Sequence, residues 1–179
     1  NEKNNKIEIK NLFFDQSFKI IDLEKILVDF LDKDNNFNSL LSPKKTEPLT
    51  IGKGRIIKKG NKVAILSFGA RLYESLKAAE ILDKKGISTS VADARFCKPL
   101  DTKLIKSLIS THDILITIEE GVVGGFGSHV MQHLTDNSLL KINSNIQSIV
   151  FPDKFIDHAT PDAMYKSANM DSLSIVKRV

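Results

Sequence analysis

The stretch TIEEGVVGGFGSHV, residues 117–130, holds the densest set of residues in this chain that could do chemistry. Two carboxylates precede four glycines, and a glycine loop between a strand and a helix often cradles phosphate. The spacing fits no dinucleotide fingerprint, because Val130 stands where the third glycine belongs, and no P-loop, because no Gly-Lys-Ser/Thr follows. Glu119 and Glu120 would repel phosphate by about 4 kcal/mol per charge pair at intermediate dielectric. We therefore predict that these glycines serve close backbone packing: Gly121, Gly124, Gly125 and Gly127.

The glycines alone do not exclude an anion, because any helix N-terminus attracts one. Adjacent residues of a strand point to opposite faces, so Glu119 and Glu120 are not expected to share one pocket. This weakens any assignment of the two as a catalytic acid and base. Arg95 follows another strand, and we predict that it forms an ion pair with one of the glutamates, structural rather than catalytic.

The histidines give no clear metal or catalytic pattern. His129 and His133 are four residues apart on a predicted helix, but no glutamate lies between them and no third ligand is evident. His158, in a loop after a strand, is the better candidate for contacting another molecule or domain, and a bond to its own backbone is the equal alternative. The single cysteine, Cys97, excludes an internal disulfide and is predicted to be a small apolar packing residue.

Composition excludes several classes of function. The chain has 179 residues, with 41% hydrophobic and 27% charged residues, as in soluble globular proteins. Its net charge of +4 comes mostly from lysine and forms no arginine-rich or aromatic stripe, so nucleic-acid binding is not predicted. No apolar run is long enough to cross a membrane. The start lacks an initiating methionine, which suggests a fragment of a longer chain.

The elements that must position these residues begin after a distinct N-terminal part. Residues 1–46 are polar and rich in asparagine and lysine, and we predict an insert or linker with one amphipathic helix at about 17–32. That helix could dock on its own domain or, less favoured, on a partner. Residues 47–179 then alternate strands with helices, which predicts a mainly parallel sheet covered on both faces. Function in such sheets lies at the carboxyl ends of the strands.

Residues that are typical of turns and helix ends predict further local structure. Gly60 and Asn61 separate two strand-like segments and favour a hairpin between them. Asp101 and Thr160 are predicted to cap helices, and Gly86 to end one. A further helix is expected after Gly127.

Five segments at and near the strand ends resemble a known family. They are EPLTIGKG, VAILSFG, ARFCKPLD, IEEGVVGGFGSHV and FPDKFIDHATPDAMY, between residues 47 and 165. Together they resemble the C-terminal, transketolase-like domain of 1-deoxy-D-xylulose-5-phosphate synthases. ARFCKPLD and FPDKFIDHATPDAMY narrow the resemblance to the synthases. The glutamate-glycine motif is shared with transketolases and the β subunits of 2-oxoacid dehydrogenases.

The resemblance implies a three-layer α/β/α fold with a mixed, mostly parallel five-stranded sheet, order 1-3-2-4-5 and strand 1 antiparallel. This order conflicts with the hairpin at Gly60, and we follow the family, because a turn reverses the chain without choosing its partner strand. Ala159 stands where the family has glycine, and alanine would be strained there if a positive φ were needed.

The resemblance also implies a transferase that joins a two-carbon unit from pyruvate to glyceraldehyde 3-phosphate, for isoprenoid, thiamine and pyridoxal biosynthesis. Thiamine diphosphate and magnesium would belong to the N-terminal and middle domains of a homodimer, so this part is expected to bind neither and to be inactive alone. We expect it to be a structural, docking domain. Its glycine loop, Glu119, Glu120 and Arg95 would pack against other domains, and Arg71 and His158 could contact substrate or the middle domain.

Two alternative functions stay open. One is the C-terminal domain of a 2-oxoacid dehydrogenase β subunit, and the other is a regulatory module that binds a small anion through Arg71, Arg95 or His158. Abundant Lys, Asn and Ile suggest an AT-rich genome. With the resemblance, this bias points to an apicoplast-type plastid, and otherwise to the cytoplasm.

Overall fold

The computed structural model describes residues 48–142 and 144–179, and the predicted insert with its helix at 17–32 lies outside the described residues. Residues Thr50–Val179 form one compact unit. Within the described ranges, no helix has the length and apolarity needed to cross a bilayer.

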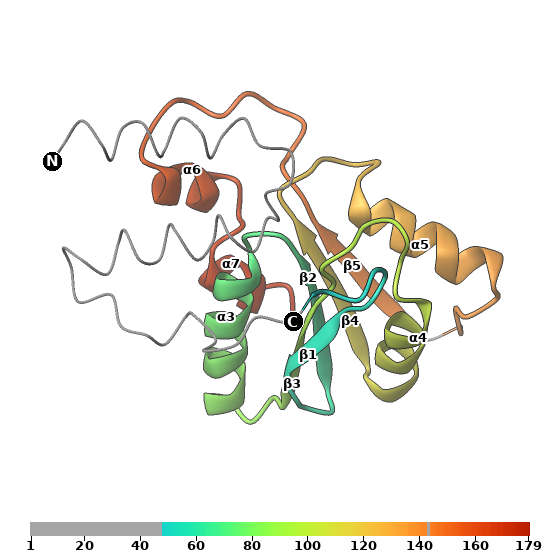
Figure 1. Ribbon diagram of the computed structural model, residues 1–179. Coiled ribbons are helices and arrows are strands. Elements are labelled where there is room, and N and C mark those ends of the chain that lie inside the picture. The colour runs from blue at the N-terminus through green and yellow to red at the C-terminus, as the bar shows by residue number, and fades with distance from the viewer. Residues whose placement is uncertain (1–47, 143) are drawn as a thin grey trace, which may run out of the picture. The chain divides into compact units, whose positions relative to one another are not determined.

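Five strands form one mixed sheet with the order β1-β3-β2-β4-β5 (Figure 1). The strands are β1 (Arg55–Lys58), β2 (Val63–Phe68), β3 (Thr89–Asp93), β4 (Ile114–Glu119) and β5 (Asn145–Ile149). β1 runs antiparallel to β3, and the other neighbours are parallel. The order that the family resemblance implied is therefore confirmed.

The hairpin predicted at Gly60 and Asn61 is wrong, because β1 pairs with β3 and not with β2. The turn carries the chain past the start of β3, where the Gly60 N–H donates to Ser90 Oγ at 2.8 Å. A Cβ on Gly60 would collide with the backbone of Thr89. The glycine is needed for this close passage, so local turn chemistry identified the residue but not the strand partner.

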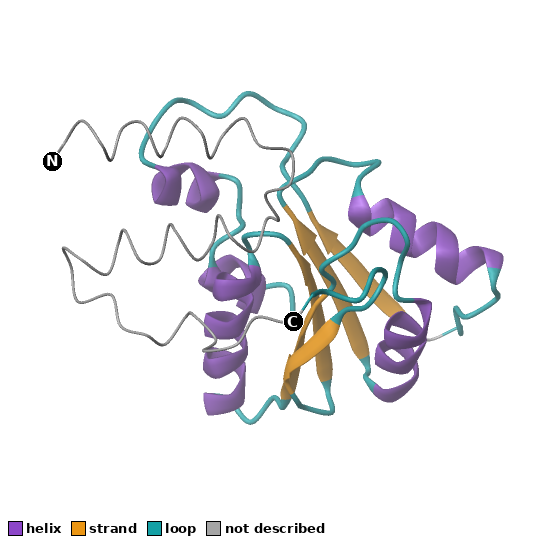
Figure 2. Ribbon diagram, in the orientation of Figure 1, coloured by secondary structure: helices purple, strands orange, loops and turns teal. Residues whose placement is uncertain are grey.

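Helices cover both faces of the sheet (Figure 2). One face carries α3 (Leu72–Lys84), α6 (Pro161–Ser167) and α7 (Ser172–Val176), and the other carries α4 (Thr102–Thr111) and α5 (Phe126–Asp136). Asp101 accepts from the Leu104 N–H at 3.1 Å and Thr160 caps α6, as predicted. Gly86 follows α3 with φ +79°, which confirms it as a stop signal.

Two apolar layers hold the elements together. On the α4/α5 side, Leu66 and Phe126 belong to one buried cluster, in which the Phe126 ring stacks on Phe68 with centroids 5.0 Å apart. On the α3/α7 side, Ile65, Ile116 and Met170 belong to a second cluster. Successive residues of β2 enter opposite layers, as strand geometry requires, and the sheet is buried on both faces. The loops at its carboxyl edge are thereby held by two independent cores.

Candidate functional site

The candidate site lies where β2 and β4 end at the centre of the sheet. The chain leaves β2 for β3 on one side and later reaches β4 on the other. This reversal of strand order is the place where open α/β sheets usually bind ligands. Glu119 ends β4, and the segment that contains Arg71 follows β2. The sequence had singled out both segments.

Glu119 is buried, and its carboxylate lies at the N-terminus of α5. Its Oε2 accepts from the Phe126 N–H and its Oε1 from the Gly127 N–H, both at 2.8 Å. These are helix N-terminal donors that have no partner within the helix. The carboxylate thus occupies the position in which a helix N-terminus would hold a bound anion. The helix begins at Phe126, earlier than predicted, because Glu119 caps it there.

Several loop glycines make room for this carboxylate. A Cβ on Gly121 would lie 2.5 Å from Glu119 Oε2, and a Cβ on Gly125 would collide with the same atom. Gly127 sits against the sheet, where a Cβ would approach Ser148 Oγ to 2.7 Å. Gly124 has φ +102°, a backbone angle that other residues rarely adopt. Gly121 and Gly125 therefore allow close packing around the Glu119 carboxylate, and Gly127 allows close packing of α5 on the sheet.

Glu120 directly follows β4 and pairs with Arg71, just before α3. Arg71 Nε lies 3.0 Å from Glu120 Oε1, and the guanidinium lies 3.5 Å from the ring centroid of Tyr165. Tyr165 in turn stacks on Phe151. The hydrogen bond to Glu120, together with burial, raises the pKa of Tyr165. These contacts join β4, the start of α3 and α6 at the carboxyl edge of the sheet.

The predicted ion pair between Arg95 and a glutamate is wrong. Arg95 Nε lies 3.8 Å from Asp93 Oδ2, in its own strand-end segment, while Glu120 pairs with Arg71. Arg95 has φ +59°, and its N–H donates to Asp93 Oδ1 at 3.1 Å. This local turn directs the side chain toward Asp93. The sequence showed which residues end the strands but not that the chain makes a tight turn directly after β3.

The candidate histidines take no part in the contacts of Glu119, Glu120 and Arg71 described above. His133 Nδ1 is 3.2 Å from Asn137 Nδ2 on the surface of α5, and His158 is exposed in the loop before α6. Across residues 48–142 and 144–179, no three His, Cys, Asp or Glu side chains are grouped to hold a metal. Non-glycine residues with positive φ in these ranges are Arg95, Ser138 and Asn169, so Ala159 is not strained in this way.

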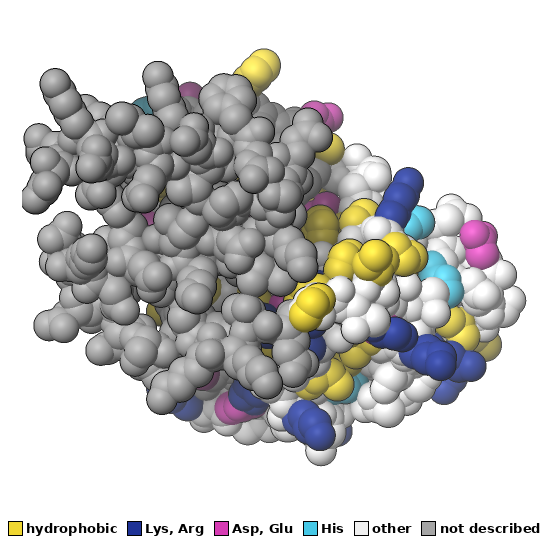
Figure 3. Space-filling model, viewed as in Figure 1, with side chains coloured by type: hydrophobic (Ala, Val, Ile, Leu, Met, Phe, Trp, Pro, Cys, Tyr) yellow, Lys and Arg dark blue, Asp and Glu magenta, His cyan; other side chains and the backbone are white. Residues whose placement is uncertain are grey.

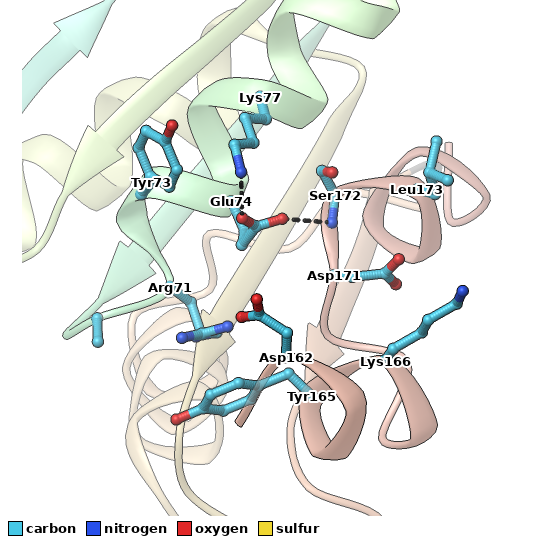
Figure 4. A pocket seen from close by; sticks show the side chains of 11 residues that line it. Arg71, Tyr73, Glu74, Lys77, Asp162, Tyr165, Lys166, Asp171, Ser172 and Leu173 are labelled. Atoms are coloured by element: carbon cyan, nitrogen blue, oxygen red, sulfur yellow. Dashed lines mark hydrogen bonds and ion pairs between the residues drawn. The ribbon is translucent and has the colours of Figure 1, made fainter. Parts of the chain in front are cut away.

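A cavity of about 490 Å³ lies between α3, α6 and α7, and the sequence did not predict it. Arg71, Glu74 and Asp162 border the same space (Figure 4). Glu74 accepts from Lys77 Nζ and from the Ser172 N–H, both at 2.9 Å. Burial opposes ionisation of Glu74, but these hydrogen bonds outweigh it and lower its pKa. Positive and negative groups alternate around the cavity, which gives it no net preference for anions.

Comparison with known proteins decides the family. Residues 52–175 match the family described as transketolase, C-terminal domain. The chain belongs to this family. A solved structure described as a split-gene transketolase, an inactive β4 tetramer, matches with a TM-score of 0.66 and 26% identity. The match covers 76% of this chain and 45% of the other, so the chain spans less than half the length of that transketolase.

Proposed function

We propose that this transketolase C-terminal domain is the docking domain of a 1-deoxy-D-xylulose-5-phosphate synthase. In its full-length form the enzyme would join a two-carbon unit from pyruvate to glyceraldehyde 3-phosphate with release of CO₂. The segments ARFCKPLD (94–101) and FPDKFIDHATPDAMY (151–165) favour this enzyme over other transketolase-like proteins. The product would feed isoprenoid, thiamine and pyridoxal biosynthesis, and the enzyme would act as a homodimer in an apicoplast-type plastid.

The observation that carries the docking role is the Glu119 cap. Thiamine diphosphate needs donors for its diphosphate and oxygen ligands for magnesium. Here the α5 N-terminus is filled by a carboxylate of the chain itself, and Arg71 is paired with Glu120. The described residues do not fit the cofactor. We therefore assign the cofactor, magnesium and the chemical step to the N-terminal and middle domains, and contact with those domains to this one.

Apolar residues at the carboxyl edge of the sheet support such a contact. The start of β1 lies beside the end of β3, so Ile51 reaches this edge and is 73% exposed. Hydrophobic side chains gather over the segment before β1 and the loop after β3 (Figure 3). Phe155, after β5, is fully exposed. Apolar surface that soluble proteins leave uncovered often marks an interface.

Deletion of this domain from the full-length enzyme tests the proposal. We expect loss of the dimer by sedimentation, a lower melting temperature, and loss of 1-deoxy-D-xylulose 5-phosphate formation from pyruvate and glyceraldehyde 3-phosphate. A truncated enzyme that keeps its dimer, stability and turnover would contradict the docking role. A full-length enzyme that makes no such product, but binds an acyltransferase core, would instead identify a 2-oxoacid dehydrogenase β subunit.

The anion-binding alternative has less support from the geometry, because two of its three residues already have partners. Arg71 pairs with Glu120, and Arg95 lies near Asp93. His158 remains exposed. Titration of the chain with pathway phosphates, followed by amide chemical shifts, would reveal such a module if signals at these three residues moved.

A further inference from the structure

Two exposed valines stand on the loop between β4 and α5. Val122 is 60% exposed and Val123 is 83% exposed, whereas Phe126, immediately after the loop, is buried. We call residues 121–125 the valine loop. Its first residue is tied to the neighbouring loop, because the Phe151 N–H donates to the Gly121 carbonyl at 2.8 Å. The same neighbouring loop later carries the exposed Phe155.

The valine loop is held in one shape by contacts that leave its apolar side chains free. The Gly125 N–H donates to the Val122 carbonyl at 3.0 Å, and the Gly124 N–H donates to Ser128 Oγ at 2.9 Å. Glu119 fixes the end of the loop through its two bonds to α5. A loop this constrained loses little conformational entropy when a partner covers it.

We infer that Glu119 is a positioning residue, whose buried carboxylate presents Val122 and Val123 to an apolar pocket on the domain that precedes this one in the same enzyme. This inference rests on the proposed docking function and names the residues that would carry it. Uncovered apolar surface often marks an interface, and the two valines follow Gly121, which is bonded to the loop that carries the exposed Phe155. The lengths of the two proteins support a partner domain in the same enzyme. This chain matches a C-terminal domain and covers only 45% of the transketolase neighbour, so a transketolase-like enzyme holds further domains.

The first test places Val123→Asp in the full-length enzyme. Docking is measured by hydrogen exchange of the amides in the valine loop and in the loop that contains Phe155. We expect exchange to rise at least tenfold, while the melting temperature of the 179-residue chain alone stays unchanged, because the substituted side chain is solvent-exposed there. Leu173→Asp is the matched control, since Leu173 is 57% exposed and lies on α7. It should leave exchange in both loops unchanged.

The second test is Glu119→Gln in the same enzyme. A glutamine amide group would face the Phe126 and Gly127 N–H donors, so the valine loop should loosen and docking should weaken at least tenfold. Protection of the core amides of β4 should persist. If Glu119→Gln fails to fold, Val123→Asp alone decides the interface. Loss of docking without any change in valine-loop exchange in the isolated Glu119→Gln chain would overturn the positioning role.

The outcomes separate this inference from the proposed function. If domain deletion damages the enzyme but Val123→Asp behaves like the Leu173→Asp control, the docking function stands and the valine loop is not its anchor. If deletion and Val123→Asp are both without effect, docking itself is disproved. Docking weakened equally by Val123→Asp and Leu173→Asp would also overturn the assignment to this loop.

Discussion

At the scale of single residues, Glu119 explains why a glycine loop at a helix N-terminus need not bind phosphate. Two charge-assisted hydrogen bonds satisfy donors that would otherwise attract an external anion. Gly121 and Gly125 then serve the carboxylate by leaving space for it. The neighbouring Glu120 has a separate role, because it pairs with Arg71 and not with the α5 N-terminus.

The surroundings of Tyr165 predict how the free energy of unfolding depends on pH. The Glu120 carboxylate and burial raise the pKa of Tyr165 above its ordinary value of 10.0. A group whose pKa is raised by folding stabilises the fold below its unfolded pKa, and that contribution is lost as pH rises through the folded pKa. Above about pH 10 we therefore expect the free energy of unfolding to fall more steeply in the wild type than in Tyr165→Phe.

Urea unfolding of the two proteins between neutral and alkaline pH measures this difference. Glu120→Gln is the matched variant, because it removes the carboxylate and keeps the tyrosine. It should move the phenolate titration of Tyr165 back toward its ordinary pKa. Identical pH profiles for wild type and Tyr165→Phe would show that the contact with Glu120 carries no such coupling.

At the scale of elements, the contact of α5 with the sheet depends on one glycine. A Cβ on Gly127 would lie 2.7 Å from Ser148 Oγ and 2.8 Å from Thr117 Oγ1, which are themselves 2.9 Å apart. Gly127→Ala should therefore push α5 away from β4 and β5. Overpacking of this kind costs about 1–3 kcal/mol.

Chemical denaturation of Gly127→Ala measures that cost as a lower free energy of unfolding. Gln132→Ala, at an exposed position of the same helix, serves as control and should change the free energy by less than about 0.5 kcal/mol. A stabilised Gly127→Ala protein would mean that alanine's higher helix propensity outweighs the close approach to the sheet.

At the scale of the whole molecule, the domain has the fold of its family, and the chain's own Glu119 fills the α5 N-terminus at which a diphosphate could bind. We predict that the 179-residue chain gives no heat of binding when titrated with thiamine diphosphate and magnesium, and no turnover of pyruvate. The full-length enzyme is the positive control in the same calorimeter. Micromolar binding to the isolated chain would require a cofactor contact from this domain and would contradict our assignment.

The sequence by itself determined the class of the fold, because runs of apolar β-branched residues alternate with helical periodicity. It also determined the caps at Asp101 and Thr160 and the stop at Gly86, which depend on neighbours a few residues away. The strand order came from the family resemblance, since the Gly60 turn pointed to another pairing. For each of these three residues, the groups that determine the cap or the helix end lie within one or two helical turns along the chain.

Only the tertiary structure decided which charges meet. Arg71 and Glu120 are 49 residues apart, and the sequence had pointed to Arg95 as the partner of a glutamate, whereas the turn after β3 directs Arg95 to Asp93. The sequence likewise contained Glu119, the anion that caps α5. It did not show that the loop folds back so that Glu119 meets an N–H group seven residues further along the chain. Sequence spacing fixes how far apart such groups are along the chain, whereas the packed sheet and helices fix their distance in space.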